Sequence, residues 1–317
     1  NEHCEEPAAM SILNLFSRSL GLIIGLPLLA ASASLWAQQP VFATPKAAVD
    51  ALIEAAASEE PGALVGVLGP GVEELHSGDP VADAAERRAF AEAAMAKKTI
   101  ELQGENLAVL NIGPEDWPFP IPLQHDDSGW YFDTEAGTDE LLNRRIGRNE
   151  LHTIAVMRAY VDAQFEYAAE DRNSDGKREY AQRLMSSEGM RDGLYWPTAE
   201  GEPDSPIGRL VAAAVTEGYR PGENTEPEPY HGYLYRVLTA QGSNAAGGAR
   251  DWITDGRLTK GFGLIAYPTQ YGNTGIMTFM VNQSGLVMER DLGDDTAGLA
   301  PAITVYDPED HWHVVTD

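Results

Sequence analysis

Hydrophobic residues change their spacing along the first half of the chain. Over residues 45–98 they recur every three or four positions, as in PKAAVDALIEAAA (45–57), which predicts amphipathic helices. Over residues 99–134 short apolar runs such as NLAVLNI and GWYFDT are separated by Gly, Asn, Asp and Pro, which predicts an antiparallel meander. Helices followed by strands predict a small α+β domain over residues 38–137.

The same order of helix and then strands returns over residues 138–317. Helical spacing predicts a tract over residues 138–170, interrupted at Gly147, with Asn149 as the N-cap of its longer part. We expect its buried face to consist of Ile154, Met157, Val161, Phe165 and Ala168.

Four apolar runs after residue 232 predict an antiparallel four-stranded meander, with Gly285 in a hairpin turn. Since neither the helix nor the sheet can bury its apolar side alone, we expect the long helix to cover one face of the sheet. The predicted fold class is therefore α+β, with two small domains that each pack helices on an antiparallel meander.

The segment that begins at Met10 has the layout of a secretory signal peptide. It carries one basic residue, Arg18, then an apolar run over residues 20–29, then small residues. The alternative is a membrane anchor, but the run is shorter than the roughly 20 residues needed to span a bilayer. We expect residues 1–37 to be a leader that is cleaved after Ala33 or Ala37, and a periplasmic or secreted protein without a stable transmembrane anchor.

The composition of the chain argues against some partners and some kinds of site. The net charge is -27, so the chain repels nucleic acid and we expect no nucleic-acid partner. An acidic surface attracts divalent cations or cationic surfaces; solubility outside the cytoplasm is the alternative explanation. The single cysteine, Cys4, precedes Met10, so the exported protein would have no thiol nucleophile or thiolate metal site.

The stretch DRNSDGKREYAQ (171–182) begins like a calcium-binding loop. Calcium takes six to eight oxygen ligands, and alternate residues of a tight loop direct several side chains inward. The last position of such a loop usually holds glutamate, and here it is Gln182. The alternative is a polar turn after a helix. The predicted ligands are Asp171, Asn173, Asp175, Glu179 and the backbone carbonyl of Lys177.

Two aromatic clusters are candidate partner-binding sites. In WPFPIPL, alternate prolines suit an edge strand, and Trp117 and Phe119 are predicted to line a docking groove; an edge protected against aggregation is the alternative. Tyr230 and His231 stand just before a predicted strand and form the second candidate, with simple turn structure as the alternative.

Several stretches resemble one family over most of the chain. EDWPFPIPL, GWYFDTEAG, RRIGRNEL, YVDAQFEYA, RDGLYWP, PYHGY and TGIMTFMVNQSG are similar to sequences of the bacterial secreted "domain of unknown function 2950" family. The second half distantly resembles the globular domain of type IV pilins and pseudopilins, which implies a pilin-like domain with one long helix on a four-stranded sheet. The first half is similar to cystatin-like cone domains. The family resemblance brings no activity with it.

The predicted function is that of an exported, non-catalytic envelope protein that acts in scaffolding or binds a protein partner in the cell envelope. None of the motifs GxSxG, HExxH or a P-loop occurs. A hydrolase or other enzyme is the first alternative, and a site where His125, His152 or His231 meets a carboxylate between the two halves would favour it. A small-solute-binding protein is the second, and an apolar pocket in the N-terminal domain would favour that.

Overall fold

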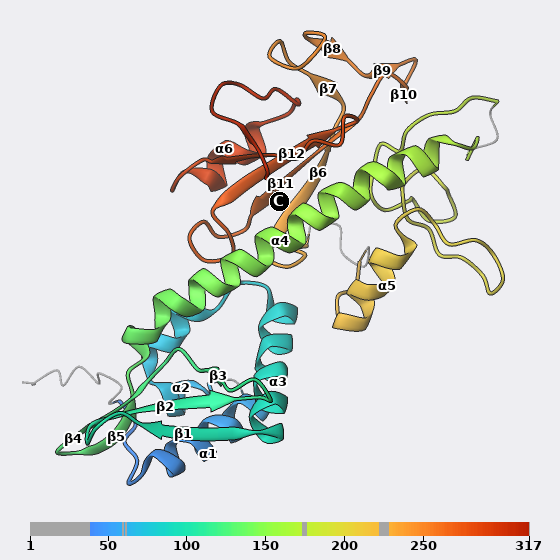
Figure 1. The fold of residues 1–317 in the computed structure, drawn as a ribbon. Coiled ribbons are helices and arrows are strands. Elements are labelled where there is room, and N and C mark those ends of the chain that lie inside the picture. The colour runs from blue at the N-terminus through green and yellow to red at the C-terminus, as the bar shows by residue number, and fades with distance from the viewer. Residues whose placement is uncertain (1–38, 59, 61, 173–175, 222–227, 317) are drawn as a thin grey trace, which may run out of the picture. The chain divides into compact units, whose positions relative to one another are not determined.

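The computed structural model describes residues 39–316 except 59, 61, 173–175 and 222–227. These residues belong to one compact unit, Ala37 to Asp317. Helices and antiparallel sheets follow one another along the chain, so the fold class is α+β as predicted (Figure 1). Within the described ranges, every helix is too short or too polar to cross a membrane.

The first sheet and its helices occupy the chain up to Phe132. Thr44 accepts a hydrogen bond from the Ala47 N–H and Asp79 accepts from those of Val81 and Ala82, so both main helices begin at a capping side chain followed by proline. The sheet order is β1-β2-β4-β5, and the short β3 pairs with β2 alone. The elements are α1 (Pro45–Ala57), α2 (Val65–Leu68), η1 (Pro70–Leu75), α3 (Pro80–Ala96), β1 (Lys98–Leu102), β2 (Leu107–Ile112), β3 (Trp117–Pro118), β4 (Leu123–Asp126) and β5 (Gly129–Phe132).

Helix α4 (Thr134–Ala168) is continuous, so the predicted interruption at Gly147 is wrong. Nothing lies near the position that a Cβ would take at Gly147, and a single glycine inside a helix costs only about 1 kcal/mol relative to alanine. The predicted N-cap role of Asn149 is wrong for the same reason. Its side chain instead donates to the carbonyl of Thr274, 2.9 Å away.

The buried face of α4 also differs from the prediction. Met157 and Val161 are buried as expected, whereas Phe165 is 48% exposed. The buried face includes Tyr160, Gln164 and Tyr167 instead, and the polar side-chain atoms of all three are hydrogen-bonded. A count of apolar residues alone misses this face, because it includes polar side chains that find hydrogen-bond partners in the tertiary structure.

The second sheet has the predicted meander and one further strand. Its order is β14-β13-β12-β11-β6, all antiparallel, and α4 packs against β11 and β12. Gly285 has a φ of 76° and donates to the Asn282 carbonyl in the turn between β12 and β13, as predicted. The elements are α5 (Gly208–Glu217), β6 (Tyr233–Leu238), β7 (Ala240–Gln241), β8 (Arg250–Asp251), β9 (Ile253–Thr254), β10 (Arg257–Leu258), β11 (Gly263–Pro268), β12 (Met277–Asn282), β13 (Met288–Asp291), α6 (Thr296–Ala302) and β14 (His313–Val314).

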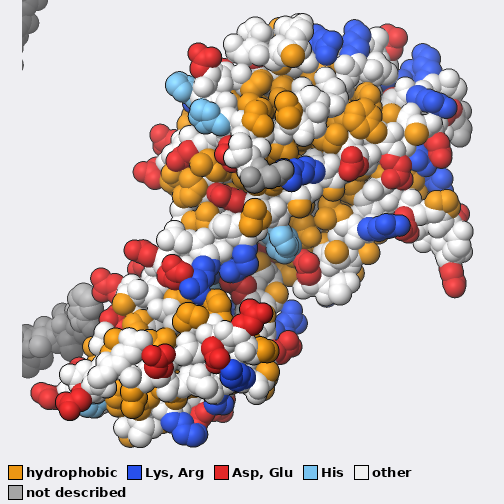
Figure 2. Space-filling view, in the orientation of Figure 1, with side chains coloured by type: hydrophobic (Ala, Val, Ile, Leu, Met, Phe, Trp, Pro, Cys, Tyr) orange, Lys and Arg blue, Asp and Glu red, His pale blue; other side chains and the backbone are white. Residues whose placement is uncertain are grey.

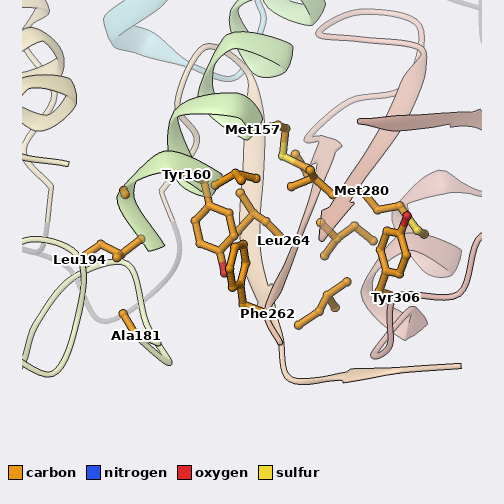
Figure 3. Packing of buried hydrophobic residues seen from close by; sticks show 14 of the residues in the cluster. Met157, Tyr160, Ala181, Leu194, Phe262, Leu264, Met280 and Tyr306 are labelled. Atoms are coloured by element: carbon orange, nitrogen blue, oxygen red, sulfur yellow. The ribbon is translucent and has the colours of Figure 1, made fainter. Parts of the chain in front are cut away.

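Buried hydrophobic side chains form two clusters. One lies between the first sheet and α1–α3, and the other lies between the second sheet and the C-terminal part of α4. In the second cluster Tyr160 of α4 lies beside Phe262, and its hydroxyl donates to the carbonyl of Gly263 (Figure 3). The predicted boundary between residues 137 and 138 falls inside α4, and the division into two domains stays a prediction.

Candidate functional site

A cavity of about 520 Å³ lies between α1–α3, the strand segment around β3 and the first turns of α4. Its wall is mostly apolar and includes Leu52, Leu68, Val72 and Ile121, all of them buried. On the face shown in Figure 2, hydrophobic side chains gather over this part of the protein, with Lys and Arg side chains beside them. An apolar cavity of this size is in the range that holds a small molecule.

Trp117 and Phe119, predicted to line a groove, both line this cavity. β3 is a short edge strand, as the prolines predict, and it holds Trp117 at the surface with 39% of its area exposed. Phe119 is buried and packs against Phe90 of α3, with ring centroids 5.0 Å apart. Whether these two aromatic residues bind a partner stays a prediction.

Four arginines, two carboxylates and one histidine complete the lining of the cavity. This local excess of positive charge contrasts with the whole chain, whose net charge is -27. The guanidinium of Arg144 stacks on the Trp117 ring, with its central carbon 4.5 Å from the ring centroid. The charged and ionisable residues are His76, Asp83, Glu86, Arg87, Arg144, Arg145 and Arg148.

The arginines that line the cavity differ in whether a carboxylate of the protein already pairs with them. Arg145 is buried; it lies 3.7 Å from Glu86 and 3.9 Å from Asp83, and it donates to Asn273 at 2.7 Å. Arg148 also pairs with Glu86. Arg87, in contrast, is half-buried and forms no hydrogen bond or ion pair with the described residues. It is therefore the cation in the wall whose charge is available to a ligand.

A tight turn places the second predicted cluster next to helix α4. Tyr230 and Tyr233 exchange backbone hydrogen bonds of 2.9 and 3.2 Å, and His231 and Gly232 between them both have positive φ. Two central residues with positive φ define a type I′ turn. A left-handed backbone is rare for histidine and is strained unless the surroundings hold it. The turn thus fixes the backbone position from which the His231 side chain projects.

His231 meets both a second histidine and a carboxylate. Its ring packs against that of His152 on α4, with centroids 4.2 Å apart, and its Nε2 lies 3.1 Å from Oε2 of Glu217 on α5. These two atoms are buried, and their mutual orientation is not that of a hydrogen bond. All three residues line a cavity of about 360 Å³. Of the candidate histidines, His125 lies elsewhere, stacked on Trp130 of the first sheet.

Asp79 accepts hydrogen bonds from the residues around this histidine cluster. Its carboxylate, on a side chain that is almost fully buried, accepts hydrogen bonds from the Tyr219 hydroxyl at 2.8 Å and from the Gly232 N–H at 3.2 Å. The same side chain caps α3 through its other oxygen. A Cβ at Gly232 would come within 2.7 Å of Thr274, so the turn approaches its neighbours as closely as glycine permits.

Burial decides the protonation behaviour of the cluster. It lowers the pKa of His231, and neighbouring His152 lowers that pKa further, although Glu217 and Asp79 act in the opposite direction. Burial also raises the pKa of Tyr230 to about 12 and raises that of Tyr219 beyond the normal range. The histidine therefore favours its neutral form, which can accept or donate a proton.

The predicted calcium loop is only partly described. Asn173 and Asp175 lie outside the described residues. Asp171 accepts a hydrogen bond from the Gly176 N–H at 2.7 Å, and Gly176 has the positive φ expected of the turn. Among the residues that the structure describes, no three His, Cys, Asp or Glu side chains are grouped as metal ligands. The proposed site at Asp171, Asn173, Asp175, Lys177 and Glu179 stays a prediction.

Sequence reasoning missed several residues of these sites. Arg87 and Glu217 lie on helices whose apolar spacing gave no reason to single them out. The arginines at positions 144, 145 and 148 did carry a signal, because three basic residues in one helical turn are unusual in so acidic a chain. Their meeting with Trp117 and Arg87 depends on the packing of α4 against η1 and its neighbours, which no local pattern encodes.

The family model described as "Protein of unknown function (DUF2950)" matches residues 39–315, and the chain belongs to this family. The match covers all of the elements that form the two sheets and both cavities. No curated protein and no solved structure matches the chain. The pilin-like and cystatin-like resemblances of its two halves therefore stay predictions.

Proposed function

We propose that this protein is an exported, non-catalytic binding protein that holds a small molecule with an apolar body and an acidic group. The observation that carries the proposal is the cavity of about 520 Å³, whose apolar wall includes the unpaired Arg87. Burial of an apolar body supplies affinity, and a guanidinium supplies orientation and a preference for carboxylate or phosphate. This develops the small-solute alternative and leaves a scaffolding role in the envelope as a companion hypothesis.

Export remains part of the proposal. It is supported by the basic, apolar and small residues in succession over residues 10–37. Small apolar acids are poorly soluble in water, and a binding protein outside the cytoplasm would carry or buffer them.

The test is a titration with a dansyl-labelled medium-chain fatty acid, whose fluorescence rises on transfer to an apolar site. Leu141 lines the cavity, whereas the adjacent Leu142 does not. Leu141→Trp fills the cavity and should abolish saturable binding, and Leu142→Trp should leave it unchanged. Equal binding by the two variants would show that the probe binds elsewhere.

Acid–base catalysis is a second candidate function. It is favoured by His231 Nε2 at 3.1 Å from Glu217 Oε2, both buried beside a cavity. A buried histidine whose neutral form is favoured, next to a carboxylate, can act as a general base. Hydrolysis of p-nitrophenyl butyrate tests it: His231→Gln should remove the activity and His125→Gln should not. A rate that is the same in both variants, or absent from the wild type, would rule this candidate out for esters.

A further inference from the structure

Strand β6 forms one edge of the second sheet and pairs with β11 on its other side. Two positions along the outer edge are closed: Tyr233 exchanges hydrogen bonds with Tyr230, and the Thr239 carbonyl accepts from the Trp252 N–H at 3.0 Å. In an antiparallel sheet, alternate residues direct their N–H and C=O groups to the same side. Tyr235 and Val237, between the two closed positions, therefore direct theirs outward as well.

The outward groups of Tyr235 and Val237 are unpaired as far as the described ranges of the chain go. Neither residue forms a backbone hydrogen bond on this side with any residue that the structure describes. Two backbone N–H donors and two C=O acceptors are thus available along this edge for pairing with a further strand. Natural proteins usually cover such an edge or protect it with proline, charge or a bulge. No proline or bulge interrupts β6 between Tyr233 and Leu238.

The open edge faces a groove of about 770 Å³. Its lining includes Val156 and Tyr160 of α4, Leu210 of α5 and the segment 182–186. Tyr235 lines the groove and reaches α4, where its hydroxyl lies 3.2 Å from that of Thr153. The side of the groove next to α4 is therefore apolar and aromatic.

We propose that an extended peptide segment of a partner protein binds in this groove as an additional strand on β6. Its main chain would pair with Tyr235 and Val237, and every second side chain would enter the apolar side next to α4. The chemistry of the occupant follows from the groove: unpaired peptide groups select a peptide main chain, and the one apolar wall selects alternating apolar residues.

A second copy of this chain fits the groove less well than a free peptide. Because residues of α5 and of the segment 182–186 line the same groove as β6, another five-stranded sheet that paired with this edge would have to be accommodated beside them. Each chain also carries a net charge of -27, which opposes close association of two copies. The proposal is separate from the ligand cavity, which lies in the other hydrophobic cluster.

Hydrogen exchange in the free protein tests whether the edge is open. The amides of Tyr235 and Val237 should exchange much faster than those of Leu234 and Arg236, which point toward β11. Equal protection of all four would show that the edge is already covered and would overturn the proposal. Protection that grows with protein concentration would identify a second copy as the occupant and would overturn it too.

A peptide-binding experiment tests whether the groove takes an extended peptide. The probe is a blocked, fluorescein-labelled peptide of alternating valine and threonine, followed by fluorescence anisotropy. It should bind wild-type protein and protect Tyr235 and Val237 from exchange, whereas its fully N-methylated counterpart, which lacks the amide donors, should not bind. No binding of the unmethylated peptide at millimolar concentration, or equal binding of both peptides, would contradict the proposal.

A pair of variants locates the binding. Val237→Pro removes an outward N–H that β11 does not use, and edge strands tolerate proline; it should weaken peptide binding by about tenfold or more, the loss expected from one hydrogen bond and its steric cost. Val237→Ala keeps the N–H and should change affinity by no more than about threefold. Peptide binding to Val237→Pro as tight as to the wild type would place the site elsewhere. If Val237→Pro does not fold, the N-methylated peptide on wild-type protein decides.

Discussion

The hydroxyl of Tyr219 donates a 2.8 Å hydrogen bond to the carboxylate of Asp79, across 140 positions of the sequence. Asp79 caps α3 beside the first sheet, and Tyr219 directly follows α5 beside the second. The same carboxylate holds the Gly232 N–H in the turn that presents His231. One buried side chain thus fixes the start of a cavity helix and the histidine cluster at once.

Loss of that hydrogen bond should destabilise the protein. Tyr219→Phe leaves the Asp79 carboxylate short of one donor in a buried site, at a cost of about 1–3 kcal/mol. Urea denaturation followed by circular dichroism measures the change. Tyr230→Phe is the matched control, because the Tyr230 hydroxyl has no hydrogen-bond partner among the described residues, and it should cost less than about 0.5 kcal/mol. Equal effects of the two changes would mean that the Asp79 contact contributes nothing.

The continuity of α4 predicts opposite effects at two of its glycines. Gly147→Ala adds a methyl group in open space inside a helix and should stabilise the protein by about 0.5–1 kcal/mol. Gly137→Ala should destabilise it by about 1–3 kcal/mol, because steric overlap forces the backbone to shift. The Cβ at position 137 would lie 2.7 Å from the Ile121 Cα and 2.8 Å from its N. Thermal or urea denaturation measures both, and a destabilised Gly147→Ala would indicate the break in the helix that the sequence suggested.

Most helices and strands of this fold could be predicted from the sequence, whereas most residues of its candidate binding sites could not. Pro45 predicted the start of a helix, and the short apolar runs of β2 and β12 predicted strands close to their observed positions, because helix starts and apolar runs are local properties. Gly147 misled the assignment of α4, since packing of this helix against η1, β11 and β12 outweighs the local cost of one glycine. Arg87 could not be identified for a different reason. Its significance is that its guanidinium has no partner among the residues that the structure describes, and only the tertiary structure reveals this.

The buried His231 predicts a dependence of stability on pH. Its pKa in the folded protein is lowered below the usual value of about 6.5, so the unfolded chain takes up a proton first as pH falls. Stability should therefore decline as pH falls below about 6.5. The groups that face the ring are His152 of α4, Glu217 of α5 and Asp79 before α3.

Comparison of two variants isolates this contribution. His231→Asn, which tolerates the positive φ, should lose less stability than the wild type between about pH 7.5 and pH 5.5. The same change at exposed His311 should leave the wild-type profile in place. Denaturation midpoints across this range measure the effect, and parallel profiles for wild type and His231→Asn would contradict it.

Thermal denaturation with calcium and with chelator tests the calcium prediction directly. If the loop at 171–179 binds calcium in the native state alone, about 10 mM calcium should raise the thermal midpoint relative to chelator, by mass action. Asp171→Asn should remove the increase, and Asp162→Asn, at an exposed position on α4, should retain it. Identical midpoints of the wild type in calcium and in chelator would remove the metal hypothesis.

The most direct test of the central proposal compares two neighbouring arginines. Arg87 lines the cavity and has no side-chain partner in the described part of the chain, whereas Arg88 is exposed and lies outside the lining. In titrations with the dansyl-labelled fatty acid, Arg87→Gln should weaken binding by about tenfold, the usual scale of one charge-assisted hydrogen bond. Arg88→Gln should bind as the wild type does, and the methyl ester of the probe should bind both variants equally. Equal affinities of Arg87→Gln and Arg88→Gln for the acid would contradict an anion-selective ligand site in this cavity.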